Sequence, residues 1–224
     1  MKKLILCALL FGCSRAHHIT EGDYGPIGIT DPAPPKTPED KPRCEPRVKV
    51  VLLSGQSNME RLARYALPEL ELEYVRHHGA TRFEFINCAE GGTMSWHWVP
   101  GGGGYENCVA MARGRGVTDI LHWQGESDAY NQITYWGQNF AKTVAGFRSS
   151  FKNELLPVIF AQIAFTTDPN WNRGWESIKQ QQAAICIPGV RMIRTDDLAV
   201  LADEVHINAE SARRIARRFA KNMR

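Results

Sequence analysis

Short apolar runs alternate with longer amphipathic stretches along the chain from residue 47 onward. Each apolar run spans five to seven residues and is continuous enough for a strand that is buried on both faces of a sheet. The stretches between them suit helices that cover such a sheet. This alternation predicts an α/β fold with three α/β/α layers and a central parallel sheet of about five strands. We expect strands at residues 48–53, 83–87, 119–123, 157–163 and 190–195, and helices at residues 58–73, 107–113, 134–152, 175–187 and 208–222.

The N-terminal residues have a different pattern, which is typical of an export signal. Lys2 and Lys3 precede an apolar stretch at residues 4–11 that is too short to cross a membrane. The stretch runs into the sequence LFGC, which is similar to the lipobox of bacterial lipoproteins, where the cysteine becomes acylated. We therefore expect lipid attachment at Cys13, and the alternative is an ordinary secretory signal cut near Ala16. Both predict an exported protein, either a membrane-anchored lipoprotein of the periplasm or cell surface or a secreted protein.

The segment that follows the signal is rich in proline. Residues 14–46 contain seven prolines and few apolar side chains, which predicts an extended tether. The remaining length suits one domain with a sizeable core. The sequence therefore divides into a signal with a lipobox-like end at residues 1–13, a tether at residues 14–46 and one folded domain at residues 47–224.

Composition and charge are those of an ordinary globular protein, with 43% hydrophobic and 23% charged residues. The formal net charge of +3 includes Lys2 and Lys3, so the exported chain is near neutral and no nucleic-acid partner is expected. Basic residues gather only in the last predicted helix. Apolar residues recur between them at helical spacing, which favours a solvated helix face over contact with an anionic polysaccharide or membrane. The basic residues are Arg213, Arg214, Arg217, Arg218, Lys221 and Arg224.

Two of the six cysteines, Cys7 and Cys13, belong to the predicted signal. The other four allow three disulfide pairings, and a bond between Cys88 and Cys108 would close the loop between them. Alternatively, Cys88 and Cys186 are small buried residues. The sequence has no CxxC or HExxH spacing, so neither a metal site nor a cofactor is predicted. The four cysteines are Cys44, Cys88, Cys108 and Cys186.

Polar residues follow the predicted strands, at the edge where parallel α/β sheets place their sites. Ser57 falls at the turn from the first strand into a helix, where its hydroxyl can be exposed and its own N–H can bind an oxyanion. The alternative is a simple helix cap. His206 comes three residues after Asp203 in a loop before the last helix. Such a histidine can accept the serine proton while the aspartate holds its other ring nitrogen.

Four short motifs follow one another along the chain. They are GQSNM at residues 55–59, the pair Gly91-Gly92, WQGESD at residues 123–128 and DEVH at residues 203–206. In these motifs the chain resembles the SGNH hydrolases, in the branch of sialate O-acetylesterases and acetylxylan esterases. The resemblance extends from about residue 48 to the C-terminus.

The resemblance implies a flavodoxin-like SGNH fold and a carboxylic ester hydrolase that acts on O-acetyl groups of carbohydrates. It implies that Ser57 is the nucleophile, that His206 is the general base and that Asp203 orients His206. The N–H of Gly92, or less favourably that of Gly91, would join Ser57 in binding the oxyanion.

One motif departs from the superfamily, whose third block is GxND with an asparagine that donates to the oxyanion. Here Ser127 stands at that place, and the side-chain amide of Gln124 is the candidate donor instead. Glu126 is a candidate supporting residue, which either contacts His206 in place of or beside Asp203 or bonds N–H groups of the loop. A similar loop role is expected for Asn58.

Trp96 and Trp98 follow the second motif, and they are candidates for an aromatic wall against a sugar ring. The alternative is packing beneath the loop. Taken together, these features predict a serine esterase for acetylated carbohydrates that works through an acyl-enzyme. The alternatives are a lipase or thioesterase on longer acyl chains, and an inactive surface glycan-binding lipoprotein.

Overall fold

The computed structural model describes residues 47–79 and 81–224. The predicted signal and tether, including Cys13 and Cys44, lie outside the described residues. Among these residues, no helix is both long enough and apolar enough to span a bilayer.

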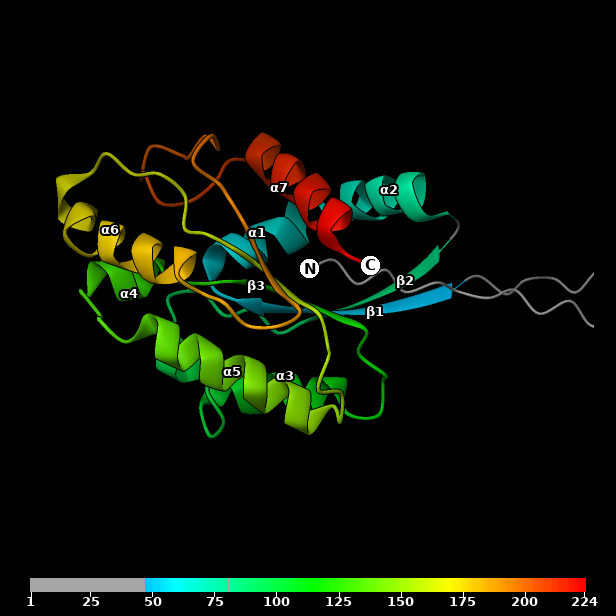
Figure 1. Ribbon diagram of the computed structural model, residues 1–224. Coiled ribbons are helices and arrows are strands. Elements are labelled where there is room, and N and C mark those ends of the chain that lie inside the picture. The colour runs from blue at the N-terminus through cyan, green and yellow to red at the C-terminus, as the bar shows by residue number, and fades with distance from the viewer. Residues whose placement is uncertain (1–46, 80) are drawn as a thin grey trace, which may run out of the picture. The chain divides into compact units, whose positions relative to one another are not determined.

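Five parallel strands form one sheet in the order β2-β1-β3-β4-β5 (Figure 1). This confirms the predicted parallel sheet. Since β1 lies between β2 and β3, the carboxyl ends of these three strands are neighbours at one edge of the sheet, where three of the candidate motifs stand. The strands are β1 (Arg47–Gly55), β2 (Thr81–Asn87), β3 (Asp119–Trp123), β4 (Val158–Ala161) and β5 (Val190–Ile193).

Helices cover both faces of the sheet and complete the three predicted layers (Figure 1). One face carries α1 (Ser57–Tyr65), α2 (Leu67–His78) and α7 (Ala209–Asn222). The other face carries α3 (Gly103–Ala112), α5 (Trp136–Ser150) and α6 (Pro169–Ala183). A short helix, α4 (Glu126–Tyr130), packs beside α6, and a 3₁₀ helix, η2 (Ser95–Trp98), follows β2.

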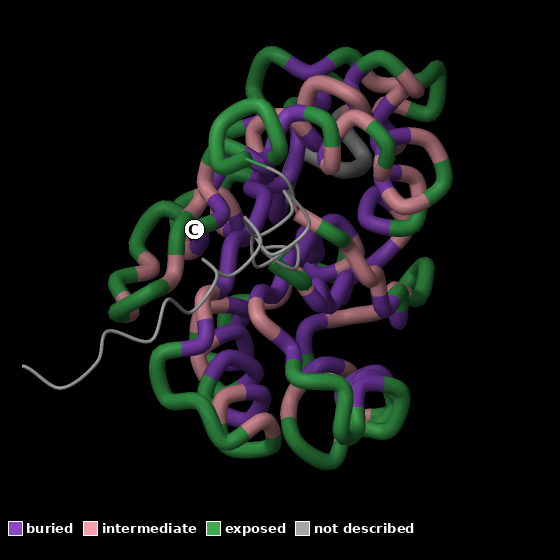
Figure 2. Tube along the Cα trace, turned by 90° about the vertical axis from the view of Figure 1, so that its right-hand side faces the viewer, coloured by how far each residue is buried: buried purple, intermediate pink, exposed green. Residues whose placement is uncertain are grey.

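The strands separate two hydrophobic clusters, one on each side of the sheet. In β1, Val50 and Leu52 pack toward α3 and α5, whereas Val51 and Leu53 pack toward α1 and α7. Figure 2 shows the buried residues gathered in the interior and the exposed residues on the outer turns. Both faces of β1 are therefore buried, as expected for an inner strand of a parallel sheet that is covered by helices on both sides.

The single helix expected at residues 58–73 is wrong, because two helices occupy this stretch. The N–H of Ala66 closes α1 by donating to Leu62 O at 3.0 Å, and α2 begins at Leu67 with Pro68 in its first turn. Proline has no N–H to donate, so it is tolerated only in the first turn of a helix and ends the helix before it.

The run of four glycines at residues 101–104 leads directly into a helix, since Gly103 and Gly104 begin α3. These glycines wrap closely around His97. A side-chain carbon on Gly102 would lie 2.4 Å from the His97 carbonyl oxygen, and one on Gly104 would lie 2.5 Å from the His97 ring. Glycine is required here by close approach rather than by mobility.

A disulfide joins Cys88 at the end of β2 to Cys108 in α3, which is one of the pairings left open by the sequence. Cys186 is free and exposed, so its interpretation as a buried residue is wrong. The basic residues of α7 face solvent and pair with acids. Arg213 bonds Glu69 at 3.1 Å and Lys221 bonds Glu73 at 3.3 Å, in agreement with a solvated helix face.

Candidate active site

The turn between β1 and α1 sets the position of Ser57. Gly55 lies so close to β3 that an added side-chain carbon would stand 2.1 Å from the carbonyl oxygen of Trp123. The next residue, Gln56, donates its N–H to the same carbonyl at 2.8 Å. Only glycine fits this contact, and its φ of +120° turns the chain sharply into α1. Ser57 is thereby the first residue of α1, at the positive end of the helix dipole.

A continuous chain of hydrogen bonds links Ser57, His206 and Asp203. His206 Nε2 lies 2.9 Å from Ser57 Oγ, and His206 Nδ1 lies 2.8 Å from Asp203 Oδ2. The structure therefore brings together all three residues of the predicted triad. The side chains of His206 and Asp203 are 35% and 48% exposed, so a solute can reach them.

Asp203 is held as a carboxylate. Its partial burial acts to raise its pKa, but three donors outweigh burial and lower the pKa to about 2. The donors are the His206 ring and the N–H groups of His206 and Val205, both of which bond Asp203 Oδ1, at 2.9 and 3.0 Å. A charged Asp203 fixes the ring so that the Nδ1 proton faces it and Nε2 is free to accept a proton from Ser57.

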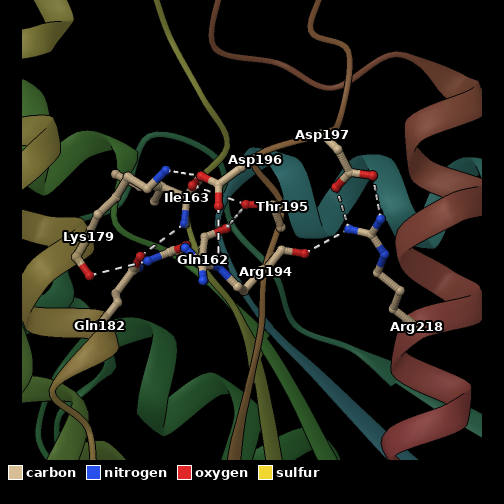
Figure 3. A network of polar contacts seen from close by, with 9 residues as sticks. All are labelled: Gln162, Ile163, Lys179, Gln182, Arg194, Thr195, Asp196, Asp197 and Arg218. Carbon is tan, nitrogen blue, oxygen red and sulfur yellow. Dashed lines mark hydrogen bonds and ion pairs between the residues drawn. The ribbon is translucent and has the colours of Figure 1, made fainter.

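Residues 194–208, here called the His206 loop, connect β5 to α7 and carry both Asp203 and His206. Figure 3 shows how the loop begins. Thr195 Oγ1 donates to the carbonyls of Gln162 and Ile163, at 2.9 and 3.1 Å. Asp197 accepts two hydrogen bonds from Arg218, at 2.8 and 2.5 Å, which lower the pKa of Asp197 to about 2. These contacts tie the start of the loop to β4 and α7.

The segment after β2 lies beside Ser57. Gly91 donates its N–H to Glu60 Oε1 at 3.1 Å, so this N–H is already paired. Gly92 lines a pocket together with Ser57. Of the two glycines considered from the sequence, Gly92 is therefore the one that shares a pocket with Ser57.

Two pockets open at Ser57 and His206. The smaller has a volume of about 350 Å³, and the larger has a volume of about 730 Å³ and extends along α1. The smaller pocket is also lined by Gln56, Gly92, Glu126, Ser127, Asp203 and Val205. The larger pocket is also lined by Glu60, Arg61, Ala63, Arg64, Leu67, Phe85 and Asn87.

Gln124 does not fit the predicted role of oxyanion donor. It is 1% exposed, and its Nε2 donates to Asp128 Oδ2 at 2.5 Å and to the Thr93 carbonyl at 3.1 Å. Its Oε1 accepts from Trp136 Nε1 at 2.7 Å. Because these neighbours already use the amide, Gln124 acts as a buried bridge that holds the segment after β2 against β3 and α5.

Glu126 and Asn58 are both buried beside the site, and they bond each other at 2.7 Å. Burial raises the pKa of Glu126, and the hydrogen bond from Asn58 opposes that rise. Within the described part of the chain, the hydrogen bonds of the His206 ring go to Ser57 and Asp203. Glu126 therefore does not replace Asp203 as the partner of the ring.

The predicted aromatic wall is absent from the two pockets, since neither Trp96 nor Trp98 lines them. Trp98 is buried and donates its Nε1–H to Thr93 Oγ1 at 3.2 Å. Trp96 is 52% exposed and donates to Met94 Sδ at 3.4 Å. Trp98 instead fits the alternative prediction, in which the aromatic side chain packs beneath the loop.

Sequence reasoning missed Arg61 and Arg64, which line the larger pocket. They follow Ser57 by four and seven residues, so the helical period places them on the same face of α1. That spacing was the signal that could have identified them. Ser127, at the place of the missing asparagine, also lines the smaller pocket. No cluster of potential metal ligands occurs among the described residues.

Comparison with known proteins decides the family. The family model described as "Carbohydrate esterase, sialic acid-specific acetylesterase" matches residues 69–224, which include the WQGESD and DEVH motifs. The chain belongs to this carbohydrate esterase family. It is thus an acetylesterase-like ester hydrolase with the SGNH fold, as the motifs predicted. No curated protein sequence matches this esterase.

Solved structures share the fold of this esterase at low sequence identity. A protein from Arabidopsis thaliana is 18% identical with a TM-score of 0.67, and the match covers 79% of this chain and 97% of that one. For NanS the identity is 11% and the TM-score 0.61, with coverage of 79% and 96%. For a carbohydrate acetylesterase from Xanthomonas citri the identity is 16% and the TM-score 0.59, with coverage of 78% and 55%.

Proposed function

We propose that this esterase removes O-acetyl groups from carbohydrates through an acetyl-enzyme on Ser57. The observation that carries the proposal is the hydrogen-bond chain from Asp203 through His206 to Ser57, which opens onto two pockets. Nucleophilic acyl transfer uses a serine as the nucleophile, a histidine as its base and a fixed carboxylate that orients the histidine.

In the first half of the reaction, Ser57 Oγ attacks the carbonyl carbon of the ester while His206 Nε2 takes the hydroxyl proton. The tetrahedral intermediate carries a negative oxygen. Its collapse breaks the bond to the sugar oxygen, which receives the proton from His206, and leaves the acetyl group on Ser57. In the second half, water attacks the acetyl group, His206 takes the water proton and returns it to Ser57, and acetate leaves.

The N–H groups of Ser57 and Gly92 are the proposed oxyanion donors. Ser57 lies at the N-terminus of α1, and Gly92 lines the pocket that Ser57 also lines. Donors at the start of a helix are already aimed before charge develops, which is the usual origin of oxyanion stabilisation. In this proposal Gln124 supports the site without touching the substrate.

Among acetylated carbohydrates, we propose an acidic sugar as the preferred substrate. The larger pocket is lined by two arginines, Arg61 and Arg64, and by one acidic residue, Glu60, whose carboxylate already accepts from Gly91. Guanidinium groups bind carboxylates by paired, charge-assisted hydrogen bonds. The family description, which names sialic acid, supports the same preference.

The experiment that tests the serine mechanism is covalent trapping. A p-nitrophenyl phosphonate ester should inactivate the protein and add one phosphonyl group, which peptide mass spectrometry should locate on Ser57. The His206→Ala variant should react much more slowly, because the serine then lacks its base. Modification at another residue, or full hydrolysis of p-nitrophenyl acetate by the modified protein, would rule the mechanism out.

Export and lipid attachment at Cys13 are a separate proposal, which rests on the sequence of the signal. Its test is fractionation of cells that express the full chain. A Cys13→Ala variant should leave the membrane fraction, whereas the unchanged chain should stay there. A variant that still sediments with membranes would count against the lipid.

A further inference from the structure

Asn58 follows Ser57 in the chain, and its side chain is fully buried between α1 and the His206 loop. Its Nδ2 donates to the carbonyl of Val205 at 3.1 Å, and its Oδ1 accepts from the N–H of Ile207 at 3.0 Å. These two residues flank His206. One side-chain amide therefore holds the backbone on both sides of the histidine that bonds Ser57.

Glu126 fixes the orientation of this amide. Glu126 Oε1 accepts from Asn58 Nδ2 at 2.7 Å, so the nitrogen has two acceptors and the oxygen has one donor. If the oxygen and nitrogen of the amide were interchanged, the oxygen would face the Glu126 carboxylate and the Val205 carbonyl, and the nitrogen would face the N–H of Ile207. The observed orientation is thus the one that satisfies all the partners, with Asn58 itself 0% exposed.

We propose that Asn58 is a positioning residue, which sets the distance between His206 Nε2 and Ser57 Oγ by holding the two peptide groups beside His206. The inference rests on the proposed function, since it requires Ser57 and His206 to react together. Asp203 orients the ring, but it belongs to the same loop and moves with it. Asn58 belongs to α1, so it ties the loop to the helix that begins with Ser57.

A second helix also bonds the His206 loop, and it provides a matched control. Ser211 in α7 is buried, and its hydroxyl donates to the carbonyl of Ala199 at 2.8 Å. Like Asn58, Ser211 joins a helix to a backbone group of the loop. Unlike Asn58, it bonds a residue seven positions away from His206.

The first test compares Asn58→Ala with Ser211→Ala, using p-nitrophenyl acetate as the substrate. In Asn58→Ala, kcat should fall by about 10²-fold while KM stays within about twofold, because the nucleophile and base are misplaced and the pockets are kept. In Ser211→Ala, kcat should stay within about threefold of the unchanged protein. Equal losses of kcat in the two variants would overturn the proposal, since general loosening of the loop would then explain both.

The second test uses rescue and stays informative if Asn58→Ala does not fold. Asn58→Asp keeps the shape and the acceptor for Ile207 but sets a second carboxylate against Glu126. Adding Glu126→Gln supplies an amide donor to that carboxylate. We expect kcat to fall by about 10²-fold in Asn58→Asp and to recover about tenfold in the double variant. A double variant no faster than Asn58→Asp would overturn the proposal.

Ser57→Ala in the same assay distinguishes a failure of the serine mechanism from a failure of the positioning role of Asn58. If Ser57→Ala keeps its activity, the serine mechanism itself fails. If Ser57→Ala is inactive while folded Asn58→Ala has an unchanged kcat, the mechanism stands and only the positioning role of Asn58 is wrong.

Discussion

Ser54 and Ser57 lie three residues apart where β1 ends, and the hydroxyl of each lies 2.9 Å from a histidine ring nitrogen. Ser54 pairs with Nδ1 of His122, and Ser57 pairs with Nε2 of His206. The distance is the same in the two pairs, but their surroundings differ. Ser54 and His122 are 0% and 3% exposed, whereas Ser57 and His206 line both pockets.

Burial also gives the two histidines different chemistry. It lowers the pKa of His122 to about 3, so this ring stays neutral at physiological pH and is a poor acceptor for a serine proton. His206 has the carboxylate of Asp203 at its other ring nitrogen, and this contact orients the ring toward Ser57. A short serine–histidine distance alone therefore does not make a catalytic site. Access and a third, charged group are needed as well.

Replacing each serine by alanine should give the two variants very different activities. Ser57→Ala should lower kcat for p-nitrophenyl acetate by about 10⁴-fold or more, because it removes the attacking oxygen. Ser54→Ala should leave kcat within about threefold and should lower the free energy of unfolding by about 1–3 kcal/mol, because His122 loses its buried partner. Steady-state kinetics and urea unfolding of both variants measure this. A large loss of kcat in Ser54→Ala would show that the buried pair takes part in catalysis.

The carboxylate is the second difference between the pairs. Asp203→Asn should lower kcat by about 10³–10⁴-fold, since the ring of His206 loses its charged partner and its fixed tautomer. Asp197→Asn is the control, because Asp197 is also a charged loop carboxylate but bonds Arg218 instead of His206. Its kcat should stay within about fivefold, in line with the small free energies of exposed ion pairs. Similar losses in the two variants would mean that loop anchoring, rather than the charge beside the ring, matters.

The burial of His122 should make the free energy of unfolding depend on pH in the acid range. Its folded pKa of about 3 lies below the ordinary 6.5, so the neutral ring contributes fully above pH 6.5 and loses this contribution as the pH falls toward 3. The loss is at most about 1.4 kcal/mol for each pH unit. In urea unfolding from pH 7 to 5, the unchanged protein should therefore lose more stability than His122→Asn, which cannot be protonated. Parallel curves would contradict the assigned burial effect.

The larger pocket adjoins Ser57 and His206 but not the buried pair of Ser54 and His122. Arg64→Ala should raise KM for an O-acetylated acidic sugar by about fivefold, the factor that corresponds to about 1 kcal/mol of lost charge-assisted bonding. KM for p-nitrophenyl acetate, which has no carboxylate, should not change. Equal KM values for the acidic sugar in the two proteins would remove Arg64 from substrate recognition.

The sheet and the grouping of Ser57, His206 and Asp203 could be predicted from the sequence because local features encode them. The inner strands β1, β3 and β4 are buried on both faces, and the parallel topology brings residues after different strands to one edge. The DEVH motif places an acid and a base in one short loop, where they meet by local geometry.

The role of Gln124 could not be predicted in this way. Its partners, among them Thr93 and Trp136, come from other segments, and which of them captures the amide depends on packing that only the folded chain defines. The same holds for Trp98, whose burial depends on the loop that covers it. Long-range partners of buried polar groups leave no periodic signal in a sequence.

The disulfide between Cys88 and Cys108 makes the segment from β2 to α3 a closed covalent ring, which contains Gly92 and the exposed Trp96. A protease that cut the backbone once inside this ring would not divide the chain into separable pieces. The two fragments would run as one species on a denaturing gel and part only after reduction. A cut in the backbone beside Ser57 would thus leave the two parts of the enzyme joined by a covalent bond.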